Sequence, residues 1–168
     1  AMDSNHTLLK KVEKTFPFKL THSQKIALDE ITADMSSSLR MHRLLQGDVG
    51  SGKTIVALLG MTIAIEAGYQ TAFLAPTEIL AQQHFDTFRD RFSSEAIHIE
   101  LLSRFRAPNE IETVLQSLPK GSPDIVIGTH RLLQDDVIFQ DLGLLIVDEE
   151  HRFGVRHKER LKQMKRVV

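Results

Sequence analysis

Cysteine is absent from this chain of 168 residues, which excludes disulfide bonds and zinc sites built on cysteine ligands. Long apolar runs are also lacking: none reaches the roughly 20 residues that a membrane-spanning helix needs. No secretory signal peptide is visible. The net charge is only −1, so the chain as a whole lacks the basic footprint of a nucleic-acid-binding domain. We therefore expect a cytoplasmic protein without a membrane partner.

The composition is that of an ordinary folded domain. Hydrophobic residues make up 42% of the chain, enough for a sizeable core, and charged residues make up 26%, which argues against global disorder. The length suits one domain. We interpret residues 1–15 as a tag remnant followed by a leader helix, and residues 16–168 as one globular lobe.

Basic residues are concentrated at one end of the sequence. Between His151 and Val168, arginine and lysine far outnumber the one acidic residue, Glu159. This run is either a solvated helix face or a surface for phosphates.

Short apolar runs alternate with helical patterns along the chain. The expected strands are 43–46, 71–75, 97–102, 124–127 and 144–147, and the expected helices are 21–35, 52–67, 77–92 and 108–118. The strand runs are rich in Val, Ile and Leu without polar alternation, as in strands buried on both faces. The pattern predicts an α/β fold with a mostly parallel sheet and helices on both of its faces.

A phosphate-binding loop follows the first expected strand. Residues 47–54 fit the pattern G-x-x-x-x-G-K-[ST] completely. Glycines let successive backbone N–H groups point inward around phosphate oxygens, at the positive end of the next helix. We predict that ATP or ADP binds here with Mg²⁺, through Gly47, Gly50, Ser51, Gly52, Lys53 and Thr54. Lys53 would neutralise the β- and γ-phosphates, and Thr54 would place its hydroxyl on the metal. The alternative is a chance match in a glycine-rich turn, which the flanking strand and helix argue against.

The last expected strand runs into an acidic pair. Asp148 would hold the water shell of Mg²⁺, and Glu149 would orient or deprotonate the attacking water. Two adjacent acids at a strand end could instead form a solvated turn. His151 either couples this site to a nucleic-acid site or is an ordinary histidine at a helix start.

The run from Asp148 to Val155, Asp-Glu-Glu-His-Arg-Phe-Gly-Val, resembles the motor domains of the RecG and Mfd families of bacterial DNA translocases. These families belong to superfamily 2 of the helicases. Residues 16–84 look more like RecG, and residues from 85 onward look more like Mfd. The chain is either a natural intermediate or a chimera of the two. The resemblance implies the first RecA-like lobe of an ATP-dependent translocase on double-stranded DNA, acting in repair.

The resemblance also implies further site residues. Phe18 and Gln24 would read adenine. The DNA sugar-phosphate backbone would be contacted by Pro76, Thr77, Gly128, Thr129, His130 and Arg131. Hydroxyl groups, helix-start N–H groups and one arginine suit phosphate contacts that do not read bases. Without the resemblance, Pro76 and Thr77 would be interpreted as a plain helix start.

Some parts of the motor are not found in this sequence. There is no motif III segment, and no second lobe with its arginine finger, which can supply about 10³–10⁵ in rate. We therefore expect nucleotide binding with little or no hydrolysis, and weak DNA binding. In the family, the motif III strand lies between the strands 43–46 and 144–147, so we expect a gap there. The two strands could close directly, another segment could fill the gap, or two copies could exchange elements in a non-native homodimer.

Two other classes remain open. One is a different P-loop ATPase, either a kinase or an ABC protein, although the ABC signature is absent and kinases lack the acidic pair. The other is an isolated nucleotide-binding module without turnover. DNA-stimulated turnover would separate a translocase lobe from such a module.

Overall fold

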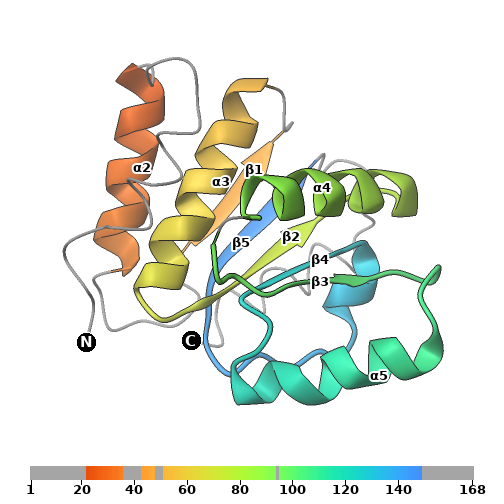
Figure 1. Cartoon of the computed structure of the whole chain (residues 1–168). Helices are drawn as coiled ribbons and strands as arrows, with labels where there is room; N and C mark the ends of the chain where they lie inside the picture. The colour runs from red at the N-terminus through yellow and green to blue at the C-terminus, as the bar shows by residue number, and fades with distance from the viewer. Residues whose placement is uncertain (1–21, 36–42, 48–50, 94, 149–168) are drawn as a thin grey trace.

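A parallel sheet of five strands forms the centre of the computed structural model, which describes residues 22–35, 43–47, 51–93 and 95–148 (Figure 1). The strand order is β1-β5-β2-β4-β3. The strands are β1 (Arg43–Gly47), β2 (Gln70–Leu74), β3 (Ile99–Leu102), β4 (Ile125–Gly128) and β5 (Leu142–Asp148). Every neighbouring pair is parallel, as the unbroken apolar runs predict.

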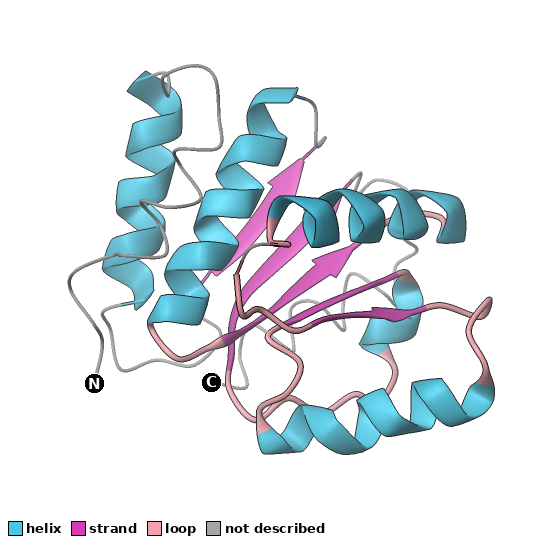
Figure 2. Ribbon diagram, in the orientation of Figure 1, coloured by secondary structure: helices cyan, strands magenta, loops and turns pink. Residues whose placement is uncertain are grey.

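Helices cover both faces of this sheet (Figure 2). They are α2 (His22–Met35), α3 (Ser51–Glu66), α4 (Glu78–Arg91) and α5 (Pro108–Ser117), with short 3₁₀ segments η1 (Leu118–Lys120) and η2 (His130–Leu133). The expected fold class is confirmed, and helix and strand ends differ from the expected ones by at most about two residues. Among the described residues, no helix is long and apolar enough to cross a membrane.

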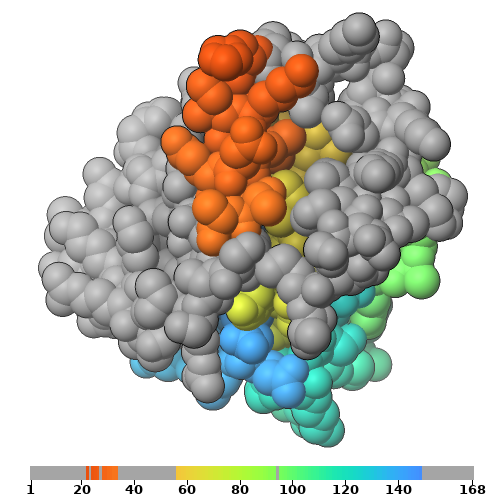
Figure 3. Space-filling model, turned by 90° about the vertical axis from the view of Figure 1, so that its left-hand side faces the viewer, coloured from red at the N-terminus to blue at the C-terminus, as the bar shows by residue number. Residues whose placement is uncertain are grey.

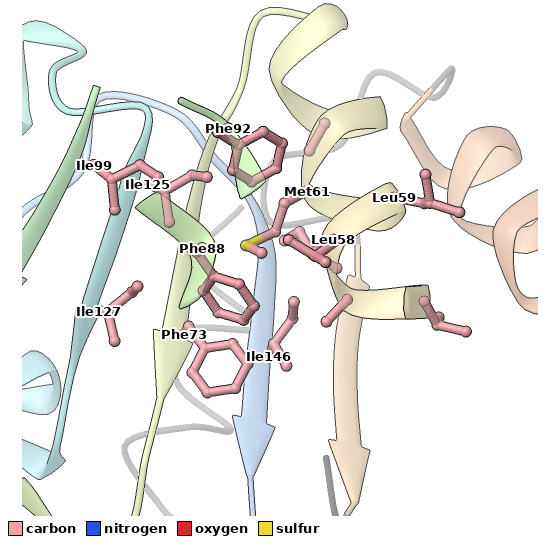
Figure 4. Close-up of a cluster of buried hydrophobic side chains, with 14 of the residues drawn as sticks. Leu58, Leu59, Met61, Phe73, Phe88, Phe92, Ile99, Ile125, Ile127 and Ile146 are labelled. Atoms are coloured by element: carbon pink, nitrogen blue, oxygen red, sulfur yellow. The ribbon is translucent and has the colours of Figure 1, made fainter. Parts of the chain in front are cut away.

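Alternate residues of the strands supply two separate cores. Phe73 of β2 and Ile146 of β5 face α3 and α4. Figure 4 shows Met61 near Phe88 and Phe92, and Phe73 next to Phe88. The residues next in sequence, such as Leu74, face α5 and the two 3₁₀ segments. This period of two explains why the central strands contain almost no polar residues.

Helix α2 forms an outer layer beside α3. Figure 3 shows it at the surface next to the residues of α3. Within this helix, Ile31 is fully buried, whereas Ile26 is 45% exposed. Thr21, the first residue of the helix expected over 21–35, lies outside the described residues.

Two glycines end helical segments. Gly68 has φ 91° after α3 and Gly121 has φ 98° after η1. At the first, the Gly68 N–H donates to Ile65 O at 2.9 Å and the Tyr69 N–H to Ala64 O at 3.0 Å. These bonds satisfy carbonyls that the helix end would otherwise leave open.

The gap expected between the first and last strands is not present in the described part of the sheet. Strands β1 and β5 pair directly, with Arg43 opposite Leu144 and Gly47 opposite Asp148. Of the three resolutions considered, the structure therefore has direct closure. A backbone ladder satisfies the N–H and C=O groups that a gap would leave open. The homodimer stays a prediction.

Gln70, the first residue of β2, is a buried polar residue at the amino end of its strand, opposite the end of the sheet at which Gly47 and Asp148 lie. Its side-chain amide donates to Leu118 O and Pro123 O, both at 3.2 Å. Its Oε1 accepts from the N–H groups of Gln140 at 3.0 Å and Asp141 at 3.2 Å. All four bonding positions of the amide are used, so the connection between α5 and β4 and the connection before β5 meet at one side chain that is 3% exposed.

Glu100 on the edge strand β3 gives a pH-dependent contribution to stability. Burial raises the pKa of this carboxyl, but hydrogen bonds from Arg106 at 2.5 Å and His98 at 2.8 Å, together with their charges, outweigh it and lower the pKa below 4.5. A lowered folded-state pKa stabilises the fold above the unfolded value and loses this effect as the pH falls.

We expect Glu100→Gln to lower the free energy of unfolding by about 1–2 kcal/mol at pH 5.5. The difference from the wild type should shrink as the pH falls below 4.5 and through the folded-state pKa. Urea unfolding at pH 5.5 and pH 3.5 measures this difference, with Glu112→Gln as an exposed control. An equal difference at both pH values would contradict the assignment.

Candidate nucleotide and nucleic-acid site

The sequence-predicted site segments meet at one edge of the sheet. Strands β1, β2, β4 and β5 are parallel, and at their carboxyl ends lie Gly47, Leu74, Gly128 and Asp148. The segments that follow β1, β2 and β4 are the phosphate-loop sequence and the two expected DNA-contacting segments. In open α/β sheets, ligands bind outside this edge.

The phosphate-loop sequence is bounded by a strand and a helix, as predicted. Gly47 ends β1, and Ser51, Gly52, Lys53 and Thr54 form the first turn of α3. The side chains of this turn, and Asp48 to Gly50 altogether, lie outside the described part of the structure. The described backbone directs the N-terminus of α3 to the same edge as Asp148. Such a helix start offers N–H groups and a positive dipole end to an anion.

Asp148 is a buried carboxylate beside the phosphate-loop strand. It stands opposite Gly47 in the ladder, and its side chain is 7% exposed. Burial of a carboxylate requires hydrogen bonds or a cation in compensation. Mg²⁺ is commonly held by one or two carboxylates together with nucleotide phosphates. The position and donor type of Asp148 fit such an ion; Glu149 lies outside the described residues.

His84 of α4 contacts Asp148, and sequence reasoning missed this contact. Its Nε2 lies 3.3 Å from Asp148 Oδ2, and its side chain is 16% exposed. Burial lowers the pKa of this imidazole and outweighs the hydrogen bond and the charge of Asp148, which raise it. A neutral imidazole that carries its hydrogen on Nε2 donates to the carboxylate. In the sequence, only its position seven residues after Thr77, an expected DNA contact, could have drawn attention to it.

The segment after β2 is built around the start of α4. Thr77 is the N-cap, and its hydroxyl accepts from the Leu80 N–H at 3.2 Å. The Thr77 side chain is exposed, and Pro76 is half-buried. The plain helix-start role is thus present, and an exposed hydroxyl at a helix start also suits a phosphate contact.

The segment after β4 packs against the start of α4. The Ala75 N–H donates to Gly128 O at 2.8 Å, and the Thr129 hydroxyl donates to Glu78 Oε1 at 3.3 Å. A Cβ at position 128 would lie 2.9 Å from Leu102 O, so this glycine is needed for close packing. The two expected DNA-contacting segments therefore form one surface.

The side chains of the segment after β4 differ in their access to solvent. Thr129 is 2% exposed, whereas His130 is exposed. Arg131 is half-buried and makes a two-pronged ion pair with Asp136, at 2.7 and 2.8 Å. The hydrogen bond to Asp136 raises the pKa of Arg131. A phosphate contact by Arg131 would have to share or replace this pair.

Of the two residues expected to contact adenine, the structure describes one. Gln24 is half-buried in the first turn of α2, and Phe18 lies outside the described residues.

Comparison with known families decides the relationship. The model of the DEAD/DEAH box helicases matches residues 21–168. This chain belongs to the DEAD/DEAH box helicase family. The resemblance inferred from the motifs is thereby confirmed.

Relatives of this helicase-family chain include both groups named from the sequence, RecG and Mfd; Mfd is the transcription-repair-coupling factor. It is 54% identical over 151 residues to the transcription-repair-coupling factor of Escherichia coli (strain K12). The aligned residues are 90% of this chain and 13% of that protein. The Bacillus subtilis (strain 168) counterpart is 50% identical over 165 residues, which is 98% of the chain and 14% of that protein. The chain thus spans about one seventh of the length of these relatives.

A solved structure of RecG bound to a three-way DNA junction is also similar to this helicase-family chain. The TM-score is 0.79 at 50% sequence identity, over 91% of this chain and 21% of that one. The RecA-like fold is therefore confirmed together with the family. Both likenesses agree with membership of the DEAD/DEAH box helicase family.

Proposed function

We propose that this chain is the nucleotide-binding lobe of an ATP-dependent translocase on double-stranded DNA, of the RecG and Mfd type. The observation that carries the proposal is the pairing of β1 with β5, with Gly47 opposite Asp148. This register brings the phosphate-loop strand and the carboxylate-ended strand together at one edge of the sheet. We infer that the nucleotide is ATP from the family relationship.

Each proposed residue has a chemical task at this edge. Lys53 would bind the β- and γ-phosphates, Thr54 and Asp148 would hold Mg²⁺, and Glu149 would orient water. The metal would supply charge neutralisation on the phosphates. Gly47, Gly50, Ser51 and Gly52 would form the phosphate cradle, with Phe18 and Gln24 at the adenine.

DNA would bind along the surface formed by the segments after β2 and β4. Pro76, Thr77 and Gly128 to Arg131 would contact phosphates, which gives no base readout. The exposed Thr77 and His130 are the side chains most accessible to a ligand. Few contacts mean weak binding with a shallow dependence on salt.

A second function, nucleotide binding without turnover, is favoured by the same pairing of strands. The family places the motif III strand between these two strands, whereas here they are direct neighbours. In the strand order that the resemblance implies, one strand would separate Gly47 from Asp148, by about 4.8 Å more than in direct pairing. Steady-state ATP hydrolysis with and without duplex DNA separates the two: stimulated turnover supports the translocase lobe, and binding without turnover supports the module.

The first test is calorimetric titration of Mg²⁺–ADP into the full chain, with Lys53→Ala as the comparison. We expect binding by the wild type and a loss of about 2–3 kcal/mol in the variant, because a charge-assisted phosphate contact is removed. That loss is roughly 30- to 150-fold in affinity. Lys120→Ala, a surface lysine far along the chain, is the control. Equal affinity for wild type and Lys53→Ala would overturn the phosphate-loop assignment.

A further inference from the structure

His84 connects helix α4 to the carboxyl end of β5. We propose that His84 is a positioning residue: it holds the Asp148 carboxylate in one orientation and thereby couples the proposed metal ligand to α4. This inference rests on the proposed function, because it concerns how Asp148 is presented to Mg²⁺ and nucleotide. It adds a residue outside the motifs from which that function was argued.

The imidazole ring of His84 is fixed by its neighbours. Its centroid lies 4.6 Å from that of Phe73, and it stacks on Phe88 with centroids 5.8 Å apart and 20° between the ring planes. Both phenylalanines are fully buried. With so little room to turn, the ring keeps Nε2 directed at Asp148 Oδ2.

Burial of a polar ring here costs free energy, and good packing alone does not require a histidine at this position. The surroundings are aromatic, and an apolar side chain of similar size would pack there without loss of hydration. The feature that an apolar residue would lose is the N–H donor toward Asp148. A carboxylate held through Oδ2 has one orientation about its terminal torsion. Outer partners of this kind commonly orient metal-binding carboxylates.

Helix α4 links this contact to the proposed DNA surface. Its N-cap is Thr77, and Glu78 in its first turn accepts from Thr129 of the segment after β4. His84 lies on the same helix, less than two turns further along. A helix this short moves as a unit, so a displacement of its first turn also displaces the ring that contacts Asp148. Helix α4 therefore begins at the proposed DNA surface and contacts the proposed metal site through His84.

The test measures how much Mg²⁺ strengthens ADP binding to the full chain. The affinity for ADP is determined by calorimetry with Mg²⁺ and with a chelator, and the ratio of the two is the magnesium increment. His84→Phe keeps an aromatic ring against Phe73 and Phe88 and removes the donor. We expect the magnesium increment to fall by about 10- to 100-fold, toward that of Asp148→Asn. Affinity for ADP without Mg²⁺ should stay unchanged.

Further variants separate positioning from a structural role. His84→Gln places an amide donor near the position of Nε2 and should keep most of the increment. His84→Leu, smaller than phenylalanine, guards against overpacking and should behave like His84→Phe. Phe92→Leu, on the same core face of the molecule, should lower stability without changing the increment. The double variant His84→Phe with Asp148→Asn should lose no more than Asp148→Asn alone.

The outcomes are distinguishable. A wild type that binds no ADP under either condition overturns the proposed function, and this inference with it. A wild type with a clear magnesium increment that His84→Phe and His84→Leu both retain overturns this inference alone. An increment lost equally in Phe92→Leu would show that any change in the core has the same effect, which also overturns it.

Discussion

Replacement of Phe88 by alanine is expected to lower the free energy of unfolding by about 3–5 kcal/mol. Phe88 is fully buried on α4, and its ring meets that of Phe73 edge-on at 5.1 Å. The substitution removes the ring that joins α4 to β2 and leaves a cavity between them. Domains of this size are stable by only about 5–15 kcal/mol. A loss of this size is a large fraction of the total.

Urea unfolding followed by circular dichroism measures this loss. Phe105→Ala is the matched control, because the same change is made at a side chain that is 65% exposed. We expect a change of at most about 0.5 kcal/mol for the control. Similar losses in the two variants would show that α4 is not packed on the sheet as described.

Gln70→Leu is expected to cost about 2–4 kcal/mol, although leucine is apolar and similar in size. The substitution leaves Leu118 O, Pro123 O and the Asp141 N–H without the side-chain partner they have in the wild type. A buried group without its partner costs about 1–3 kcal/mol. The total is below the simple sum because Gln140 still donates to Leu118 O at 3.1 Å. Loss of the carbonyl acceptor also frees the loop before β5.

Thermal and urea unfolding of Gln70→Leu and Gln70→Glu test this account. Glutamate keeps an acceptor for the Gln140 and Asp141 N–H groups but removes the donor to the two carbonyls. Gln116→Leu, on the exposed side of α5, is the control and should change stability by at most about 0.5 kcal/mol. A Gln70→Leu variant as stable as the wild type would mean that these four bonds contribute nothing net.

The order of strands and helices was predictable because each strand is an apolar run buried on both faces. For β5, the run from Leu144 to Val147 alternates between the two cores and admits no polar residue, so the strand is evident without knowledge of its neighbours. Gly68 and Gly121 mark helix ends for a local reason, since both have a positive φ. Features that depend on a few neighbouring residues are therefore readable from the sequence.

Features that depend on contacts between distant segments were not predictable. His84 and Asp148 are 64 positions apart, and no local pattern joins a histidine on a helix to an acid at a strand end. A local contact was missed as well: the ion pair of Arg131 with Asp136, five positions further along the chain, gives an expected phosphate ligand a protein partner. The direct pairing of β1 with β5 was one of three open resolutions, because the register depends on the whole sheet.

The number of strands between β1 and β5 acts as a spacer. Neighbouring strands lie about 4.8 Å apart, so each inserted strand would move Gly47 away from Asp148 by roughly that distance. With none inserted, the two residues are opposite each other in one ladder. A strand supplied from elsewhere would have to open this ladder before it could form two new ones. The sheet thus sets the separation between the ends of these two strands in steps of one strand width.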